Sequence, residues 1–331
     1  MLDFKKLRIV FMGTPEFAVA SLDALVKAGC NIVGVITAPD KPGGRGMQLQ
    51  QSDVKKYAVE NKLTILQPEK LKNPEFLDQL KFLRADLQIV VAFRMLPELV
   101  WNMPQMGTVN LHGSLLPQYR GAAPINWAVI NGEKETGVTT FKLQQEIDTG
   151  DILLQESFAI EDNDTAGDVH DRMKQIGATL LVKTVKGLAD GTLKERPQGS
   201  MGNGPWQTEE PGNINGHSAF NTANSPKHAP KIFTETGKID FNKSLDAVYN
   251  LIRGLSPYPT AFCFLKEKKL KIYRAEKIKK QTLIAAGEIE TDGKTYLQFA
   301  CADGYLLILD LQLEGKKRMA IGDFLRGYRL E

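Results

Sequence analysis

Short apolar runs alternate with helix-like segments over the first third of this 331-residue chain. LRIVFMG at 7–13, IVGVIT at 32–37, LQIVVAF at 87–93 and TVNLH at 108–112 have the length and composition of strands. The run at 87–93 is almost continuously apolar, which is typical of a strand that is covered on both faces. Strands that alternate with helices favour parallel pairing, so the sequence predicts an α/β fold with a doubly wound, mostly parallel, Rossmann-like sheet.

The segments between these runs carry the spacing and the end signals of helices. Thr14 can cap the first of them, and the proline and glutamate that follow suit a first helical turn. Further helices are expected at 53–61, 74–83, 96–103 and about 165–189, and further strands at 64–68, 139–147 and 151–160. We therefore interpret residues 1–198 as one domain.

Residues 199–230 differ in composition from what precedes them. They are rich in Gly, Asn, Ser and Pro and lack periodicity, which indicates a linker or an exposed loop. Residues 231–331 then hold one helix-like run, DAVYNLIRGL at 246–255, and several short alternating runs separated by turns such as TDGK and ADGY. Short strands at this spacing predict a second, smaller domain built as an OB-like β-barrel.

Charge is distributed unevenly along the chain. Residues 227–331 contain 19 Lys+Arg against 13 Asp+Glu, a net of +6, whereas the whole chain carries only +3, so residues 1–226 carry −3. A basic C-terminal third behind a mildly acidic N-terminal part favours a polyanionic partner, although a solvated basic surface would have the same composition.

The cysteines and the N-terminus bear on location. Cys30, Cys263 and Cys301 are far apart and match neither a zinc-binding spacing nor a disulfide framework. The first residues lack the long apolar region of a signal peptide, and no run approaches the ~20 apolar residues of a membrane span. We expect a cytoplasmic monomer that is not associated with a membrane and needs no metal.

Asn110 and His112 stand two positions apart at the end of the expected strand 108–112. Residues i and i+2 of a strand face the same side, and ligands of open α/β sheets bind beyond the C-terminal strand ends. An amide can donate to a carbonyl oxygen as charge builds on it, and an imidazole can take or give a proton. The alternative is a turn asparagine beside a structural histidine.

Asp148 lies in an Asp-Thr-Gly turn between two expected strands. Its functional interpretation requires the fold to bring it beside His112, where a carboxylate would orient the imidazole and favour its charged form. Ser114 is nearby, but no G-x-S-x-G elbow surrounds it, so the set suits a transfer in which the substrate brings its own nucleophile. FMGTPEF at 11–17 is not G-x-G-x-x-G, which disfavours a nicotinamide dehydrogenase.

Several motifs together resemble the methionyl-tRNA formyltransferases, a family of folate-dependent formyltransferases. The similarity runs over nearly the whole chain, through TAPDKPGGRG (37–46), VNLHGSLLPQYRGAAPINWAVINGE (109–133), EIDTGDIL (146–153), LIRGLSPYP (251–259) and GKKRMAIGDFL (315–325). The resemblance implies transfer of a formyl group from 10-formyltetrahydrofolate to the α-amine of charged initiator methionyl-tRNA, in support of translation initiation.

The resemblance also implies roles for individual residues. The catalytic residues of the family fall on Asn110, His112 and Asp148. Its folate-contacting segment falls on Ser114, Leu115, Leu116 and Pro117, and a second folate segment on Phe93, Arg94 and Met95, where AFRMLPE departs from the more common AYGMILP-like form. Its tRNA-acceptor loop falls on the glycine-rich segment, with Lys41 and Arg45. Further tRNA contacts are expected from the C-terminal basic residues Lys266, Lys268, Lys269, Lys271, Lys316, Lys317 and Arg318.

Three other functions remain open at this point. The same core could act on a small amine, such as a purine precursor or an amino-sugar nucleotide, or could release formate by hydrolysis. APDKPGGRG and the basic C-terminal region argue against both, because a small substrate needs neither. A non-catalytic RNA-binding protein would instead make Asn110, His112 and Asp148 incidental.

Overall fold

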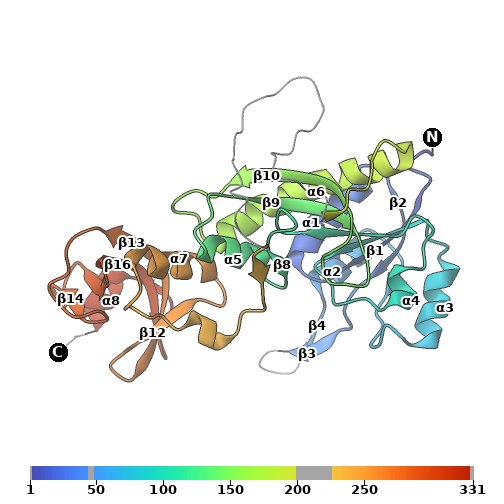
Figure 1. Cartoon of the computed structure of the whole chain (residues 1–331). Helices are drawn as coiled ribbons and strands as arrows, with labels where there is room; N and C mark the ends of the chain where they lie inside the picture. The colour runs from blue at the N-terminus through green and yellow to red at the C-terminus, as the bar shows by residue number, and fades with distance from the viewer. Residues whose placement is uncertain (1, 44–47, 199–225, 329–331) are drawn as a thin grey trace. The chain divides into compact units, whose positions relative to one another are not determined.

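A computed structural model describes residues 2–43, 48–198 and 226–328. Within that part of the chain the first sheet has seven strands: β1 (Arg8–Gly13), β2 (Asn31–Ile36), β5 (Ile65–Leu66), β6 (Leu87–Val91), β7 (Thr108–His112), β9 (Glu135–Lys142) and β10 (Ile152–Ala159). Their order is β10-β9-β7-β6-β1-β2-β5, with parallel pairing from β7 to β5 and β9 antiparallel to β7. Figure 1 labels β10, β9, β1 and β2 of this sheet. The predicted doubly wound, mostly parallel sheet is confirmed.

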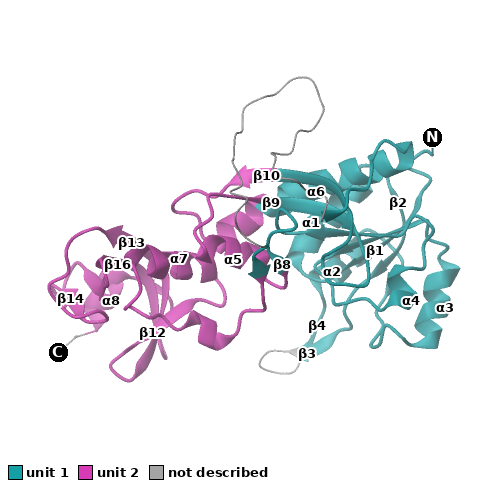
Figure 2. Ribbon diagram, in the orientation of Figure 1, with its two compact units in different colours: residues 1–120, 137–156, 173–228 teal, residues 121–136, 157–172, 229–331 magenta. Residues whose placement is uncertain are grey.

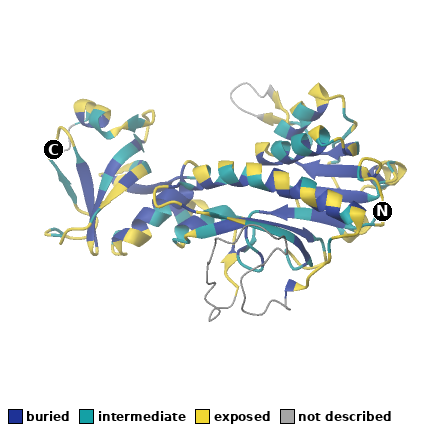
Figure 3. Cartoon of the chain, turned by 90° about the horizontal axis from the view of Figure 1, so that it is seen from above, coloured by how far each residue is buried: buried dark blue, intermediate teal, exposed yellow. Residues whose placement is uncertain are grey.

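Helices cover both faces of this sheet. They are α1 (Glu16–Lys27), α2 (Asp53–Glu60), α3 (Pro74–Phe82), α4 (Glu98–Trp101) and α6 (Ala166–Asp190). The remaining helix of this part of the chain, α5 (Pro124–Ile130), belongs to the second unit described below. Met12 and Val90 pack with Phe76 of α3 on one face. On the other face α6 comes so close that a Cβ on Gly177 would lie 2.9 Å from Leu111. The strands between these layers are mostly buried (Figure 3), and the sheet is the core of the first compact unit.

Three local predictions differ from the structure. α1 begins at Glu16 with Pro15 as its N-cap residue, so Thr14 is not the cap. β9 covers 135–142 rather than 139–147, because the chain turns back after Lys142 towards β10. The glycine-rich segment, which we expected to be a loop, includes β3 (Lys41–Gly43), and β3 pairs antiparallel with β4 (Gln48–Gln50), which lies just after that segment. Its backbone pairing has no periodic apolar signal in the sequence.

The chain divides into two compact units that exchange segments (Figure 2). Residues 121–136 and 157–172, which the predicted domain 1–198 includes, group with residues 229–331. The reason lies in helix packing, since α5 lies against α7 (Leu245–Leu255). Asn126 donates to the Gly254 carbonyl at 2.8 Å, and a Cβ on Gly254 would lie 2.5 Å from Ile130. One boundary near 198 therefore does not describe this division.

The second unit is built around an antiparallel sheet that forms a half-barrel. Its strands are β12 (Ala261–Leu265), β13 (Lys268–Ile278), β14 (Ile289–Thr291), β15 (Leu297–Cys301), β16 (Gly304–Leu313) and β17 (Met319–Ala320). The order is β12-β13-β16-β15-β14, and β17 pairs with β16. The unit also holds α7, the short 3-10 helix η2 (Thr234–Gly237) and α8 (Ile321–Gly327), while β8 (Arg120–Gly121) and β11 (His228–Ala229) form a two-stranded sheet.

The apolar residues of α7 and of the half-barrel form one core that includes two of the cysteines, Cys263 and Cys301. Neither forms a disulfide, as the sequence predicts, and burial raises the pKa of the Cys263 thiol to about 12. These cysteines therefore serve as small core residues. None of the helices in the described ranges is long and apolar enough to cross a membrane.

Candidate active site

Asn110 and His112 lie on one face of the first sheet, as the strand period predicts. Asn110 is level with Val90 of β6 and Phe141 of β9. His112 meets the Phe141 ring edge-on, with ring centroids 6.4 Å apart. The side chain of Asn110 is half-buried and has no hydrogen-bond partner among the described residues, so its amide is available to a ligand.

His112 is buried, and its two ring nitrogens have different surroundings. Nε2 lies 2.9 Å from the carbonyl oxygen of Tyr119. A carbonyl oxygen can only accept a hydrogen bond, so Nε2 carries a hydrogen and donates it. Nδ1 is then the nitrogen that gains or loses a proton, and it lies 3.8 Å from Oδ2 of Asp148. The fold thus brings together the two side chains that are 36 positions apart in the sequence.

The turn that carries Asp148 has an unusual backbone. Asp148 has a φ of 54°, in the left-handed region that aspartate and asparagine enter more readily than most residues do. A Cβ on Gly150 would lie 1.6 Å from the Lys142 carbonyl oxygen, so no other residue fits that position without moving the chain. The Asp-Thr-Gly sequence is therefore what this turn needs in order to lie against the end of β9.

The loop after His112 is held by side-chain hydrogen bonds to its own backbone. Ser114 Oγ donates to the Gln118 carbonyl at 2.6 Å, and Thr139 Oγ1 donates to the Ser114 carbonyl at 2.6 Å. Gln155 Nε2 donates to the Leu116 carbonyl at 2.9 Å and to Thr139 Oγ1 at 2.9 Å. Ser114 is thus an internal hydrogen-bond donor, which agrees with the absence of a nucleophile motif around it.

Leu115 and Pro117 in this loop are partly exposed, whereas Leu116 is buried with Phe141 and Ile152. Of the four residues in the predicted folate segment, only Leu115 and Pro117 therefore have side chains that a ligand could contact. Ser114 and Leu116 shape the backbone instead.

The second predicted folate segment follows β6, and its three residues, Phe93, Arg94 and Met95, have different environments. Phe93 is partly buried against the core under α3 and α4. The guanidinium of Arg94 donates to two main-chain carbonyls of the segment after β5, so it holds that segment in place. Met95 is 73% exposed. The structure brings these residues to the same C-terminal edge of the sheet as His112, because β6 is the neighbour of β7.

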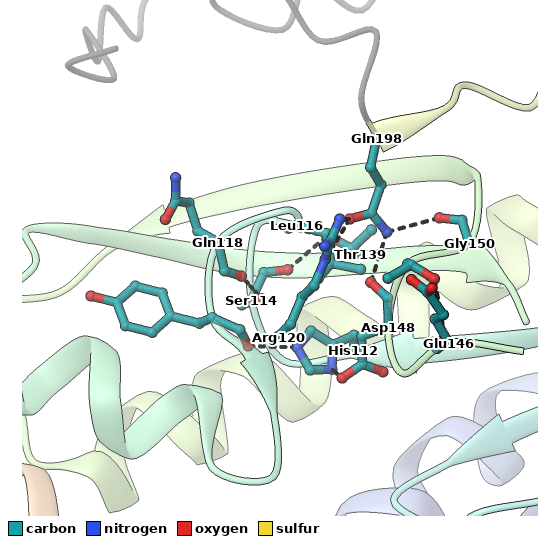
Figure 4. A network of polar contacts seen from close by, with 12 residues as sticks. His112, Ser114, Leu116, Gln118, Arg120, Thr139, Glu146, Asp148, Gly150 and Gln198 are labelled. Carbon is teal, nitrogen blue, oxygen red and sulfur yellow. Dashed lines mark hydrogen bonds and ion pairs between the residues drawn. The ribbon is translucent and has the colours of Figure 1, made fainter. Parts of the chain in front are cut away.

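Sequence reasoning missed one functional candidate, Gln198. Its side chain is buried and lies between Arg120 and the turn of Asp148 (Figure 4). No motif marks this glutamine, and it stands at the end of the predicted domain, next to a stretch without periodicity. Thr139 and Gln155 were missed for the same reason, since their hydrogen-bond partners are distant in the sequence.

The base of the glycine-rich segment is tied down by Asp40. It accepts hydrogen bonds from Lys55 Nζ at 2.5 Å and Gln67 Nε2 at 2.8 Å, and the Lys55 hydrogen bond is the main reason that the pKa of Asp40 is lower than usual. Lys41 is exposed in β3, level with Gln50. Arg45 lies outside the described residues.

The predicted C-terminal tRNA contacts occupy two turns of the half-barrel and the strands beside them. Lys266, Lys268, Lys269 and Lys271 belong to the β12–β13 hairpin, and Lys316, Lys317 and Arg318 to the turn between β16 and β17. Lys269 Nζ lies 3.6 Å from the centroid of the Phe262 ring. Arg318 is an ion-pair partner of Asp310 and stacks over Tyr273, 4.3 Å from its centroid. These contacts restrict the side chains of Lys269 and Arg318 more than solvent alone would.

Comparison with known proteins assigns the chain to a class. Residues 7–185 match the model of the formyl transferase family, and residues 231–329 match the model of the formyl transferase C-terminal domain. The chain therefore belongs to the formyl transferase family, and it is an enzyme that transfers a one-carbon formyl group.

Curated relatives narrow this class. The methionyl-tRNA formyltransferase of Parabacteroides distasonis is 54% identical over 329 residues, and that of Bacteroides fragilis is 51% identical over 329 residues. Each alignment covers 98% of this chain and 96% of the relative. Within the family, the chain belongs with the methionyl-tRNA formyltransferases.

Solved structures share the fold at lower identity. An N-formyltransferase from Helicobacter canadensis, in complex with folinic acid and dTDP-3-aminofucose, has a TM-score of 0.63 at 21% identity, over 95% of this chain and 100% of the other. HypX from Aquifex aeolicus, in complex with tetrahydrofolic acid, has a TM-score of 0.61 at 16% identity, over 97% of this chain and 48% of the other. At these identities the likeness concerns the fold.

Proposed function

We propose that the protein transfers the formyl group of 10-formyltetrahydrofolate to the α-amine of methionine on charged initiator tRNA. The arrangement of His112 carries the proposal. Nε2 is committed to the Tyr119 carbonyl, and Nδ1 faces Asp148 at 3.8 Å at the C-terminal edge of the sheet. Such a pair can accept and return a proton without being a nucleophile, which is what an amine substrate requires. The names of the relatives support the choice of amine.

In this mechanism the neutral α-amine attacks the formyl carbon, and a new N–C bond forms. The carbonyl oxygen becomes an oxyanion in the tetrahedral intermediate. Asn110, whose amide has no partner in the described residues, donates to this oxygen, and His112 stabilises it when protonated. Charge that builds on the oxygen is thus met by a donor that is already in position.

Collapse of the intermediate breaks the bond between the formyl carbon and N10 of the folate. The proton lost by the amine passes to N10 through Nδ1 of His112, and Asp148 stabilises the imidazolium meanwhile. The products are the formylated aminoacyl-tRNA and tetrahydrofolate. Holding the amine and the formyl group together contributes by effective concentration, with a ceiling of roughly 7–11 kcal/mol in well-oriented systems.

The folate is proposed to lie against the loop 113–117 and the end of β6. The hydrogen bonds of Thr139 and Gln155 hold this loop in one conformation, so its backbone can be presented to the ligand. Leu115 and Pro117 would contact the folate with their side chains, and Ser114 and Leu116 through the main chain. Phe93 and Met95 would border the ligand, while Arg94 keeps its place in the neighbouring segment.

The charged tRNA is proposed to contact both compact units. Lys41 and Arg45 of the glycine-rich segment would meet the acceptor end, since arginine can fork to a phosphate or stack on an unpaired base. Lys266, Lys268, Lys269, Lys271, Lys316, Lys317 and Arg318 would meet the phosphate backbone. These basic groups favour tRNA over a small amine such as an amino sugar. We further propose that the enzyme is a cytoplasmic monomer.

Formyl transfer by the purified protein tests the proposal. We expect formylmethionyl-tRNA to accumulate when the enzyme is given 10-formyltetrahydrofolate and charged initiator tRNA. Two parallel reactions test the rival functions: one offers an amino-sugar nucleotide as the formyl acceptor, and the other contains no amine, so that water is the only acceptor. Formylation of the sugar in preference to the tRNA, or release of formate alone, would replace this function with one of its rivals.

The half-barrel lysines should act through charge rather than through sequence recognition. Removal of one phosphate contact reduces the slope of log affinity against log salt by roughly 1. We expect this change for Lys268→Ala and for Lys317→Ala, with equal loss for initiator and elongator tRNA. Lys27→Ala on α1 makes the same change of net charge and should leave the slope as it is. A titration of tRNA binding at several salt concentrations measures it, and an unchanged slope in both half-barrel variants would make these lysines solvated surface groups.

A further inference from the structure

Gln198 uses every hydrogen-bonding position of its side-chain amide. Oε1 accepts from Nε of Arg120 at 3.0 Å and from a terminal nitrogen of the same guanidinium at 2.5 Å. Nε2 donates to the carbonyl of Asp148 at 2.9 Å and to that of Gly150 at 2.8 Å (Figure 4). Its side chain is buried, with 7% of the residue exposed. A buried amide with two accepted and two donated bonds is fully satisfied.

The two donated bonds act on the turn that carries the proposed catalytic carboxylate. They hold the carbonyls on both sides of Thr149, so the backbone of Asp148 cannot rotate without breaking them. Asp148 has a φ of 54°, a conformation that persists only where its surroundings enforce it. This backbone sets the direction in which the carboxylate points, and Oδ2 lies 3.8 Å from Nδ1 of His112.

The two hydrogen bonds that Gln198 Oε1 accepts determine the orientation of the side-chain amide. A guanidinium can only donate, so the oxygen of Gln198 must face Arg120 and its NH₂ group must face the turn. Arg120 follows Tyr119, whose carbonyl accepts the hydrogen bond of His112 Nε2 at 2.9 Å. Gln198 therefore joins the two segments that contact the two nitrogens of the His112 ring.

We propose that Gln198 is a positioning residue for proton transfer, acting with Arg120 to hold Asp148 at Nδ1 of His112. The proposal rests on the catalytic roles proposed for His112 and Asp148. Gln198 touches neither substrate in this account. It acts through the backbone of residues 148–150, which its two donated hydrogen bonds hold.

Substitution of glutamate for Gln198 separates this role from a purely structural one. A carboxylate would keep or strengthen the contact with Arg120, so a glutamine that merely ties Arg120 down would be replaced without loss. In Gln198→Glu, however, an oxygen would face the carbonyls of Asp148 and Gly150, and both donated bonds would be lost. If Gln198 positions the turn, Gln198→Glu should be at least as slow as Gln198→Ala.

The experiment measures steady-state formylation of charged initiator tRNA by the full-length variants, which gives kcat and KM. A displacement of about 1 Å in a catalytic group can cost about 10²-fold, so we expect Gln198→Ala and Gln198→Glu to lower kcat by roughly 10- to 100-fold. The KM values for tRNA and folate should change little. Arg120→Lys, which keeps a donor but loses the fork, should be intermediate. Hydrogen exchange at residues 149–151 should become faster in the slow variants.

Gln88→Ala is the matched control for loss of a buried amide. Gln88 is fully buried in the same unit, accepts from Thr108, and lies near the start of β6, whereas the site lies beyond the strand ends. We expect it to lower thermal stability about as much as Gln198→Ala does, while keeping kcat.

A double variant tests the route of the effect. If Gln198 acts through Asp148, Gln198→Ala should slow an Asp148→Asn enzyme much less than it slows the wild type. Wild-type kcat in Gln198→Glu, or full additivity with Asp148→Asn, would overturn the proposal. Failure of the underlying mechanism would look different, because His112→Ala and Asp148→Asn would then themselves keep their rates.

Discussion

We expect His112→Ala to lower kcat for formyl transfer by roughly 10²- to 10⁴-fold, the usual contribution of a general acid–base group. His112 Nδ1 is the one ring nitrogen left to exchange a proton, because Nε2 donates to the Tyr119 carbonyl. The loss should fall on kcat and on kcat/KM alike, since the interaction belongs to the transition state. Steady-state kinetics with charged initiator tRNA and 10-formyltetrahydrofolate measures both.

The control for this variant is His170→Ala. His170 is partly exposed on α6 and lies next to Asp171, its ion-pair partner when protonated, so it offers the same change of residue at a histidine outside the proposed catalytic set. Thermal unfolding of both variants shows whether loss of the ring beside Phe141 has disturbed the fold. A His112→Ala enzyme that is folded and turns over at the wild-type rate would exclude His112 from the mechanism.

We expect Asn110→Ala to lower kcat by roughly 10²- to 10³-fold, the cost of removing one donor to an oxyanion. The side-chain amide of Asn110 is half-buried and unpartnered in the described part of the chain, so its removal breaks no hydrogen bond of the protein. The variant should therefore fold normally and bind tRNA and folate with little change. Rapid-quench measurement of a single turnover isolates the chemical step.

Two further variants test whether the effect of Asn110→Ala is due to loss of the hydrogen-bond donor. Asn110→Asp keeps the shape of the side chain but replaces the donor by a negative charge, so it should be as slow as Asn110→Ala. Asn102→Ala, on the exposed residue that ends α4, should keep the wild-type rate. A fast Asn110→Asp enzyme would show that the oxygen needs no donor at this position.

The prediction of the first sheet succeeded where apolar periodicity and burial agree. The runs at 7–13 and 87–93 became β1 and β6, because strands that are covered on both faces must be apolar along their length. The prediction was weaker wherever hydrogen bonds between distant segments decide the structure. The hairpin of β3 and β4, the extent of β9 and the exchange of segments between the two units belong to this group.

In the candidate site, too, the local features could be predicted from the sequence and the contacts between distant segments could not. The sequence by itself determined that Asn110 and His112 share a face at the end of a strand, because the strand period is a local property of the backbone. It could not determine from spacing that Asp148 meets His112, since that contact depends on where β9 ends and on the close approach of Gly150 to Lys142.

Gln198 was beyond the reach of sequence reasoning, because a single polar residue without a motif has no local signal. The role proposed for it depends on four hydrogen bonds to groups that lie 48 to 78 positions away along the chain. Local periodicity thus determined the strands and the direction of their side chains. The tertiary structure alone decided which side chains meet at the strand ends, because those contacts join segments that no local pattern relates.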